Sequence, residues 1–324
     1  MSGPAGRFAP SPSGDLHIGN IRTGLLAYAR ARQTGRRFLW RIEDLDRVRA
    51  GAAAAQLRVF ADLGVVPDEE PLVQSQRLDR YAAAVETLSA AGLVYECYCS
   101  RRDIQQAPSA PHAPPGAYPG TCRSLGEAER VRRRAELAAA GRQPALRLRT
   151  ENAEITVADG LLGTITAPVD DFVLRRGDGV YAYNLTVVVD DSASGIDEVV
   201  RGDDLASSAP RQAHLGGLLG AAEQSWLHVP LVLGESGARL AKRDGAVTAQ
   251  ELTALGWSTA DVYAWVWRSL GGDGGVDLGD RPWATIDDLV DGVDFAQLRR
   301  EPSVFLPPTA ADASTFADGT APSP

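Results

Sequence analysis

The sequence has few cysteines, no long hydrophobic run and no excess of positive charge. It holds 3 cysteines in 324 residues, a small and odd number that argues against a disulfide framework. No segment approaches the length of a membrane-spanning helix, and the N-terminus lacks the basic and apolar regions of a secretory signal. We therefore expect a cytoplasmic protein that makes no membrane contact.

The overall charge is acidic, with a net charge of -9 and a sequence pI near 5.1. This balance argues against a general nucleic-acid coat, because non-specific affinity depends on neutralising phosphates. A local basic patch remains compatible with RNA binding. Two interpretations stay open for this patch, an RNA contact or a solvated helix face. Its residues are Arg123, Arg130, Arg132, Arg133, Arg134, Arg142, Arg147 and Arg149.

The stretch from Arg7 to Asn20 reads R-F-A-P-S-P-S-G-D-L-H-I-G-N and predicts a strand, a constrained turn and the start of a helix. A helix start after a strand presents free N–H groups and a positive dipole end, which suit a phosphate chain. His17 and Asn20 can donate hydrogen bonds to phosphate oxygens. The alternative is a surface loop in which His17 only bonds to its neighbours.

Acidic residues follow the next predicted strand, residues 38–42, at its carboxyl end. Open α/β sheets bind their ligands at this edge. Glu43 is therefore a candidate partner for a substrate cation, although an acid here can also cap the next helix. Helices are predicted for residues 52–63, 78–91 and 209–219, and a strand for residues 227–233. The run 186–189 fits either a central strand or a core helix.

The three thiols lie at Cys97, Cys99 and Cys122, around a Pro-rich stretch of residues 107–119. Three thiolates are three of the four ligands that a structural zinc ion takes. His112 or Tyr118 can supply the fourth, and chemistry alone prefers His112. Short apolar alternations between residues 145 and 165 predict a small β-rich insertion after this segment.

These motifs together resemble the glutamyl and glutaminyl branch of the class I aminoacyl-tRNA synthetases. The stretch from Arg7 to Asn20 is similar to the family's HIGH signature, with Asn20 as its last residue, and R-I-E-D-L-D is similar to a second family string. The string from Asp171 to Asp191 is also similar to that branch. A-R-L-A-K-R resembles the KMSKS signature, although Arg239 and Ala241 depart from it. The similarity covers roughly residues 5–245.

The resemblance implies a Rossmann-like α/β fold, glutamate and ATP with Mg²⁺ as substrates, and a defined set of site residues. Catalytic roles fall on His17, Asn20 and Lys242. The nucleotide would contact His17, Ile18, Gly19, Asn20 and Lys242, and glutamate would contact Arg7, Phe8, Ala9, Pro10, Ser11, Glu43, Tyr183 and Arg201. An arginine is a suitable partner for a carboxylate, because its guanidinium forms a bidentate fork.

The cysteine pattern narrows the resemblance to the glutamyl-queuosine tRNA(Asp) synthetases, which carry C-x-C followed by Y-x-x-x-C. The match places zinc on Cys97, Cys99, Tyr118 and Cys122, with a swap to His112 left open. The chain ends soon after Lys242, whereas glutamyl-tRNA synthetases continue into an anticodon-reading domain. We therefore expect glutamate transfer to the queuosine base at the wobble position of tRNA(Asp), by a monomer that binds the anticodon stem-loop.

The alternatives are a compact glutamyl-tRNA synthetase acting on the 3′ end of tRNA(Glu), a ligase for a protein or small amine, and a non-catalytic zinc or RNA-binding relic. The predicted organisation has four parts. Residues 1–95 plus 181–247 form the catalytic domain, and residues 96–180 form an inserted zinc-containing subdomain. Residues 248–306 form a helical region, and residues 307–324 form a disordered tail.

Overall fold

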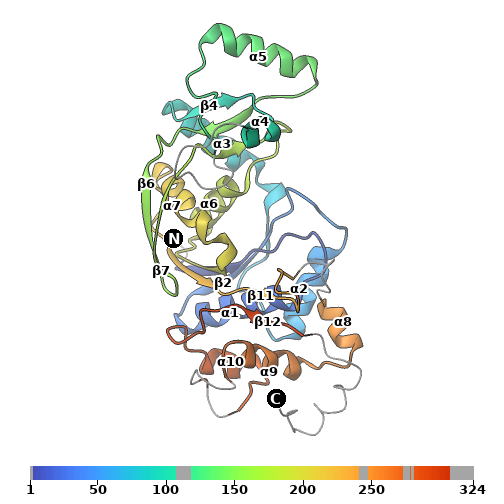
Figure 1. The fold of residues 1–324 in the computed structure, drawn as a ribbon. Helices are drawn as coiled ribbons and strands as arrows, with labels where there is room; N and C mark the ends of the chain where they lie inside the picture. The colour runs from blue at the N-terminus through green and yellow to red at the C-terminus, as the bar shows by residue number, and fades with distance from the viewer. Residues whose placement is uncertain (1–2, 107–117, 241–246, 273–277, 279–280, 307–324) are drawn as a thin grey trace.

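The computed structural model describes residues 3–106, 118–240, 247–272, 278 and 281–306. His112, Ala241, Lys242 and the tail predicted for residues 307–324 lie outside these ranges. The chain is arranged along one long axis, with α5 (Glu127–Ala139) at one end and α9 (Thr259–Ser269) at the other (Figure 1). None of the described helices has the length and apolar character needed to cross a bilayer.

A parallel sheet occupies the middle of the molecule. β1 (Ala5–Phe8) pairs with β2 (Arg37–Ile42), which pairs with β3 (Leu72–Val73). A parallel bridge from Ala5 to Ile196 joins β1 to the start of β9 (Glu198–Gly202), and β9 pairs with β10 (Ser225–Val229). The strand order is therefore β3-β2-β1-β9-β10, with all five strands parallel. From β1 to β3 the sheet grows outward in one direction and from β9 to β10 in the other, so the point at which the order reverses lies between β1 and β9. Ligands of open α/β sheets bind at such a reversal.

The first strands are buried on both faces, although β1 carries Arg7 and β2 carries Arg41. The four residues of β1 are all buried, as are the central residues of β2, which is typical of parallel strands covered by helices. Phe8, Trp40 and Phe60 pack with ring centroids 5.1–5.2 Å apart. Gly24 of α1 (Ile18–Gln33) faces Phe60 of α2 (Ala52–Asp62) so closely that a Cβ would lie 2.3 Å from its ring.

The run 186–189, which fitted either a strand or a helix, lies in α6 (Tyr183–Ser194). Thr186, Val187 and Val188 are buried, because α6 packs against α3 (Leu78–Ala90) and α7 (Ala209–Leu218). Gly195 ends the helix with φ 71°, a left-handed conformation that favours glycine. A β-branched run is thus helical here because tertiary burial overrides its strand preference.

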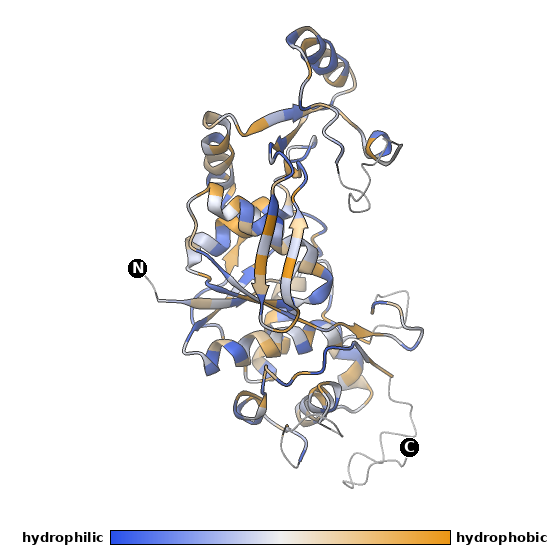
Figure 2. Ribbon diagram, turned by 60° about the vertical axis from the view of Figure 1, so that its left-hand side comes forward, coloured by the Kyte–Doolittle hydropathy of each residue, from blue (hydrophilic) through white to orange (hydrophobic). Residues whose placement is uncertain are grey.

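The residues predicted as a β-rich insertion divide between two sheets. β4 (Val94–Cys97), β5 (Ala145–Leu148) and β8 (Val173–Arg175) form an antiparallel sheet beside α4 (Arg101–Gln106) and α5. β6 (Glu154–Asp159) and β7 (Gly163–Pro168) form a hairpin whose hydrophobic and hydrophilic residues alternate (Figure 2). β6 also pairs with β10 through Asp159 and Trp226. Strand pairing therefore crosses the predicted boundary of residues 96–180.

The single strand expected over residues 227–233 is wrong, because two strands occupy this range. β10 ends at Val229, and β11 (Val232–Leu233) pairs with β12 (Ser303–Val304) instead. Pro230 lies between them and has no N–H group with which to continue the ladder. Two short 3₁₀ helices, η1 (Gln74–Gln76) and η2 (Asp203–Ser208), follow β3 and β9.

The described part of the region after residue 247 contains α8 (Ala249–Ala254), α9 and α10 (Ile286–Gly292). Each helix begins with a capping box, in which a Ser or Thr and an acidic residue three positions later satisfy each other's backbone N–H groups. Tyr263, Trp265 and Val266 of α9 belong to the same buried cluster as Ile21 and Leu25 of α1. These helices therefore pack against α1, which in turn packs against β1, β2 and β9.

Candidate functional site

A cavity of about 900 Å³ lies where β1 and β9 end. Its lining includes most of the predicted glutamate and nucleotide contacts, which come from segments far apart in the chain. They are Arg7, Phe8, Ala9, Pro10, Ser11, His17, Gly19, Asn20, Glu43, Tyr183 and Arg201. Ile18 instead lies in the hydrophobic core and is 0% exposed. Lys242 lies outside the described residues.

The start of α1 forms one wall of the cavity. Asn20 N donates to His17 Nδ1 at 3.3 Å, and His17 N donates to Asn20 Oδ1 at 3.4 Å. Burial lowers the pKa of His17 to about 4, so its ring is neutral at pH 7 and, with Nδ1 accepting, carries its proton on Nε2. Both side chains cap the helix, yet the His17 Nε2–H and the Asn20 amide N–H groups are donors that these two bonds do not use.

The loop between β1 and α1 is held by side-chain and backbone hydrogen bonds. Gln56 of α2 donates to the carbonyl oxygens of Ser11 and Gly14 at 3.2 and 2.8 Å. The N–H of Glu43 donates to the carbonyl oxygen of Pro10 at 3.3 Å. Gln56 is 3% exposed. The loop that carries the predicted site is therefore fixed by elements on two sides.

Two arginines and two carboxylates form a buried network beneath the cavity. Asp191 of α6 contacts Arg7 Nε at 3.4 Å and also pairs with Arg41, which contacts Glu43 at 3.1 Å. Burial disfavours the charged form of Asp191, but the Arg41 and Arg7 guanidiniums hold its pKa below the ordinary value. Burial raises the pKa of Glu43 despite the neighbouring Arg41. A further cation beside Glu43 would favour its charged form.

Arg201 is a buried cation without a carboxylate partner. It is 5% exposed, and no acidic group of the described residues lies within the 4.0 Å of an ion pair. Its hydrogen bonds go to neutral acceptors, including Gln212 Oε1 at 2.8 Å and the Tyr183 hydroxyl at 3.4 Å. Burial lowers the pKa of Arg201. An anion in the cavity, such as a carboxylate, would compensate this charge.

The described part of the KMSKS-like string also reaches the cavity. Arg239 lines it and forms an ion pair with Asp204 of η2 at 3.0 Å. The Arg239 side chain is 67% exposed. A cationic side chain is therefore present at the open side of the cavity, tethered by one acidic residue.

Sequence reasoning missed several side chains that build the site. Asp191 was recognised only as part of a resembling string, and Arg41, Gln56, Gln212 and His228 were given no role. The acidic pair at the end of the β-branched run was a usable signal for Asp191. The partners of the other four lie on different elements, and the sequence pattern carries no signal for them.

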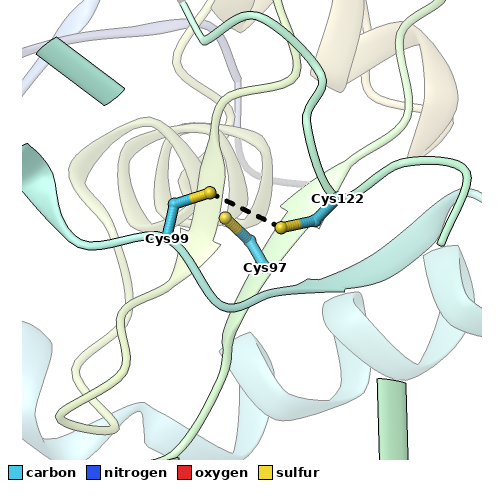
Figure 3. Close-up of side chains that lie close together, drawn as sticks. All are labelled: Cys97, Cys99 and Cys122. Carbon is cyan, nitrogen blue, oxygen red and sulfur yellow. Dashed lines mark hydrogen bonds between the residues drawn. The ribbon is translucent and has the colours of Figure 1, made fainter. Parts of the chain in front are cut away.

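The three cysteines meet at the end of the molecule that carries β4 and β5, as Figure 3 shows. Their sulfur atoms all lie within 4.8 Å of one another, and the sulfur atoms of Cys99 and Cys122 are 3.5 Å apart. The Tyr118 hydroxyl lies 3.4 Å from Cys97 Sγ and 3.9 Å from Cys99 Sγ. Ligands around a tetrahedral zinc ion are separated by about 3.5–3.8 Å. These side chains can therefore hold a metal ion.

The predicted basic patch is not an unpaired positive surface in the described residues. Arg132 and Arg133 pair with Glu129, Arg134 pairs with Glu96, and Arg123 pairs with Asp171. Arg147 is 6% exposed, and its guanidinium lies 3.6 Å from the centre of the Tyr118 ring. Neighbouring acidic residues neutralise most of these arginines, so the geometry favours the solvated helix face, and the RNA contact stays a prediction. Helix α5 itself is a solvated helix with no buried residue.

Comparisons with known proteins show the family to which the chain belongs. The family model for the catalytic domain of class I tRNA synthetases (E and Q) matches residues 5–268. The chain is 55% identical over 300 residues to the Glutamyl-Q tRNA(Asp) synthetase of Nocardia farcinica (strain IFM 10152), covering 93% of this chain and 92% of that protein. It is 47% identical to the Glutamyl-Q tRNA(Asp) synthetase of Cutibacterium acnes (strain DSM 16379 / KPA171202), over 82% of this chain and 76% of the relative.

Longer relatives match as well. Glutamate--tRNA ligase 2 of Halorhodospira halophila (strain DSM 244 / SL1) is 37% identical over 93% of this chain and 63% of its own length. A crystal structure of a glutamate tRNA ligase from Elizabethkingia meningosepticum CCUG26117, in complex with its amino acid, superposes with a TM-score of 0.78. That pair shares 24% sequence identity, over 97% of this chain and 69% of the other. The structural likeness shows a shared fold.

Proposed function

Because the chain belongs to the class I tRNA synthetases (E and Q), among the Glutamyl-Q tRNA(Asp) synthetases, we propose that it activates glutamate with ATP and transfers it to the queuosine base of tRNA(Asp). The observation that carries this proposal is the buried, uncompensated Arg201 in one cavity with Glu43 and the start of α1. This cavity offers a cation for a carboxylate, an acid for an ammonium group and a helix start for phosphates.

Activation needs positioning and charge stabilisation more than a protein nucleophile. The α-carboxylate of glutamate attacks the α-phosphorus of ATP, which gives glutamyl-adenylate and releases pyrophosphate. Arg201 and the Tyr183 hydroxyl would hold the side-chain carboxylate, and Glu43 would hold the α-ammonium group. Arg7 lies beneath them as a second cation, and residues 8–11 form the loop against which the substrate would rest.

The nucleotide would lie against the start of α1. The His17 Nε2–H and the Asn20 amide would donate to phosphate oxygens, and Gly19 leaves the His17 ring its place, since a Cβ there would lie 3.1 Å from His17 Nδ1. Mg²⁺ would accompany ATP, as expected for a class I synthetase. Lys242 would neutralise charge on the leaving pyrophosphate.

Transfer completes the proposed reaction. A nucleophile of the queuosine base attacks the carbonyl carbon of glutamyl-adenylate, and AMP leaves. The acceptor would be the anticodon stem-loop of tRNA(Asp). The second candidate is a compact glutamyl-tRNA synthetase that esterifies the 3′ end of tRNA(Glu), which is favoured by the 37% identity to a Glutamate--tRNA ligase 2.

The decisive experiment measures glutamate-dependent ATP–pyrophosphate exchange without tRNA, followed by transfer of labelled glutamate to queuosine-containing tRNA(Asp) and to tRNA(Glu). We expect exchange without tRNA and label on tRNA(Asp) alone. Label on the 3′ end of tRNA(Glu) would support the second candidate. Activity indifferent to both tRNAs would indicate another acceptor, and absence of exchange would indicate a non-catalytic protein.

We also propose that Cys97, Cys99, Cys122 and Tyr118 hold a structural zinc ion. The spacing of the sulfur and hydroxyl atoms supports a tetrahedral site. Metal analysis of purified Cys122→Ala protein is the direct test, because one lost ligand should remove most of the bound zinc. The matched control is Tyr98→Phe, which alters a neighbouring hydroxyl that bonds to Glu96. Undiminished zinc in the Cys122 variant would contradict this site.

A further inference from the structure

Three neighbouring strands bring Asp159, His228 and Arg201 into one row. Asp159 ends β6, His228 lies on β10, and Arg201 lies on β9 directly opposite His228 in the parallel register. All three are buried, with His228 0% exposed. The row runs from the β6–β7 hairpin to the cavity, and Arg201 is the one of the three that lines the cavity.

The carboxylate of Asp159 is fixed by backbone donors. Its Oδ1 accepts from the N–H groups of Leu161 and Leu162 at 2.9 and 2.8 Å, and its Oδ2 accepts from the N–H of His228 at 3.1 Å. Burial disfavours the charged form of Asp159, but the bonds from His228 and these backbone groups hold its pKa below the ordinary value. Asp159 is therefore an anion with little freedom to turn.

The position of this anion determines where His228 carries its proton. His228 Nδ1 lies 2.6 Å from Asp159 Oδ2, and a carboxylate can only accept, so Nδ1 carries the proton. Burial lowers the pKa of His228 despite the neighbouring Asp159, which keeps the ring neutral. His228 Nε2 is then an acceptor, and Arg201 Nε donates to it at 3.0 Å.

We propose that Asp159 and His228 are positioning residues for the carboxylate of the amino-acid substrate, acting through Arg201. Asp159 selects the Nδ1–H tautomer of His228, and His228 holds the Nε side of the Arg201 guanidinium away from the cavity. The inference rests on the proposed function, since it assigns Arg201 a glutamate carboxylate.

The other contacts of Arg201 explain why this anchor matters. A guanidinium has five N–H donors, and four hydrogen bonds to described residues are present, to His228, Gln212, Tyr183 and the carbonyl oxygen of Leu205. The Trp226 ring, 4.8 Å from the guanidinium carbon, supports one face. With the opposite tautomer, His228 Nε2–H would face Arg201 Nε–H, and the guanidinium would have to rotate.

The contacts from Asp159 through His228 to Arg201, called the relay from here on, give Arg201 a hydrogen-bond acceptor without neutralising its positive charge. A carboxylate in direct contact with Arg201 would compete with the substrate, whereas the neutral imidazole accepts one hydrogen bond and leaves the positive charge for the ligand. Asp159 is thus separated from Arg201 by one ring. The pairing of a carboxylate with an imidazole that orients a third group is a general device of binding sites.

The test compares two substitutions of His228 in glutamate-dependent pyrophosphate exchange. His228→Gln places an amide oxygen near the position of Nε2 and can still accept from Arg201, whereas His228→Leu cannot. We expect His228→Leu to raise the KM for glutamate about tenfold or more while the KM for ATP stays within about twofold, and His228→Gln to recover most of the loss. His214→Gln on α7, whose ring lines a different cavity, is the matched control.

A second measurement does not depend on activity. With 4 histidines in the chain, ¹⁵N labelling and the His228→Gln variant identify the His228 ring signals. We expect a neutral Nδ1–H ring in the unmodified protein and a shift toward Nε2–H in Asp159→Asn. An Nε2–H ring in the unmodified protein would overturn the relay.

The kinetic outcomes separate the two proposals. A normal KM for glutamate in His228→Leu, or an equal rise of both KM values, would overturn the relay while leaving glutamate activation intact. Absence of glutamate-dependent exchange in the unmodified protein would overturn the proposed function, and the role of the relay would fall with it.

Discussion

Asp191 is the residue on which the charge network beneath the cavity depends. It lies between Arg7 and Arg41 and is almost fully buried. Asp191→Asn leaves two buried guanidiniums with too little negative charge, and we expect the free energy of unfolding at pH 7 to fall by about 3–5 kcal/mol. Urea unfolding measures this change. Asp197→Asn, which affects a partly exposed pair with Arg36, should cost less than about 1 kcal/mol.

The same carboxylate predicts a pH dependence of stability. The pKa of Asp191 is lower in the folded protein than in the unfolded chain, so its stabilisation is complete above the unfolded value of about 3.9. It is lost as the pH falls through the folded pKa, because the folded state then also binds the proton. We expect the stability difference between the unmodified protein and Asp191→Asn to narrow below about pH 3.9. A constant difference down to pH 3 would contradict this assignment.

The site residues that could be predicted belong to sequence motifs that resemble the family's. The site residues that were missed gain their role only from side chains on other elements of the fold. Glu43 follows a buried strand, so its place at a sheet edge could be anticipated, and Arg201 came from the resemblance. His228 gave no signal, because its role arises only when β6, β9 and β10 become adjacent. Asp191 and Arg41 are 150 positions apart in the sequence. Such pairings follow from tertiary structure.

At the scale of elements, the start of α1 combines a capping role with the proposed nucleotide contact. His17→Asn keeps an acceptor for the Asn20 N–H, whereas His17→Ala removes it, and both remove the Nε2–H donor. We expect both variants to lose pyrophosphate exchange, but only His17→Ala to lose stability, by about 0.5–2 kcal/mol. Thermal unfolding and exchange assays on the pair separate the two roles. Full exchange in His17→Asn would mean that His17 is only a cap.

The crossing of α1 and α2 depends on one glycine. A Cβ at Gly24 would lie 2.3 Å from Phe60, and Phe60 is 1% exposed, so Gly24→Ala should destabilise the protein by about 1–3 kcal/mol. Gly217→Ala on α7 is the matched control, because no atom lies within 4 Å of its added methyl group. This control should be neutral or slightly stabilising, since alanine favours helices. Equal effects of the two substitutions would contradict the packing argument.

Element boundaries could be predicted where local chemistry determines them. The helices expected at residues 52–63, 78–91 and 209–219 agree within one residue with α2, α3 and α7, and the helix expected to open near His17 is α1. Residues 186–189 and 227–233 were different. Apolar β-branched runs fit a buried strand and a buried helix equally well. Packing between α3 and α7 determined that residues 186–189 are helical. Pairing with β12 determined that residues 227–233 divide into two strands.

At the scale of the whole molecule, the predicted metal site and the cavity rest on different hydrophobic clusters. Cys97, Tyr98, Tyr118 and Cys122 form a small buried group of their own, whereas the elements around the cavity belong to the largest cluster. A polar link through Asp170 is one of the connections between the two regions in the described residues. Asp170 accepts from the Tyr118 N–H at 3.0 Å and pairs with Arg211 of α7 at 2.7 Å, and the next residue, Gln212, contacts Arg201.

This arrangement predicts that metal removal separates activation from transfer. After chelation, dialysis and readdition of Mg²⁺ alone, we expect tRNA-free pyrophosphate exchange to stay within about twofold, while glutamate transfer to tRNA(Asp) falls about tenfold or more. The reason is that loss of the ion would loosen the β4–β5–β8 end without disturbing the core beneath the cavity. Readdition of zinc should restore transfer. A parallel loss of exchange would show instead that the Asp170–Arg211 link transmits the disorder to Arg201.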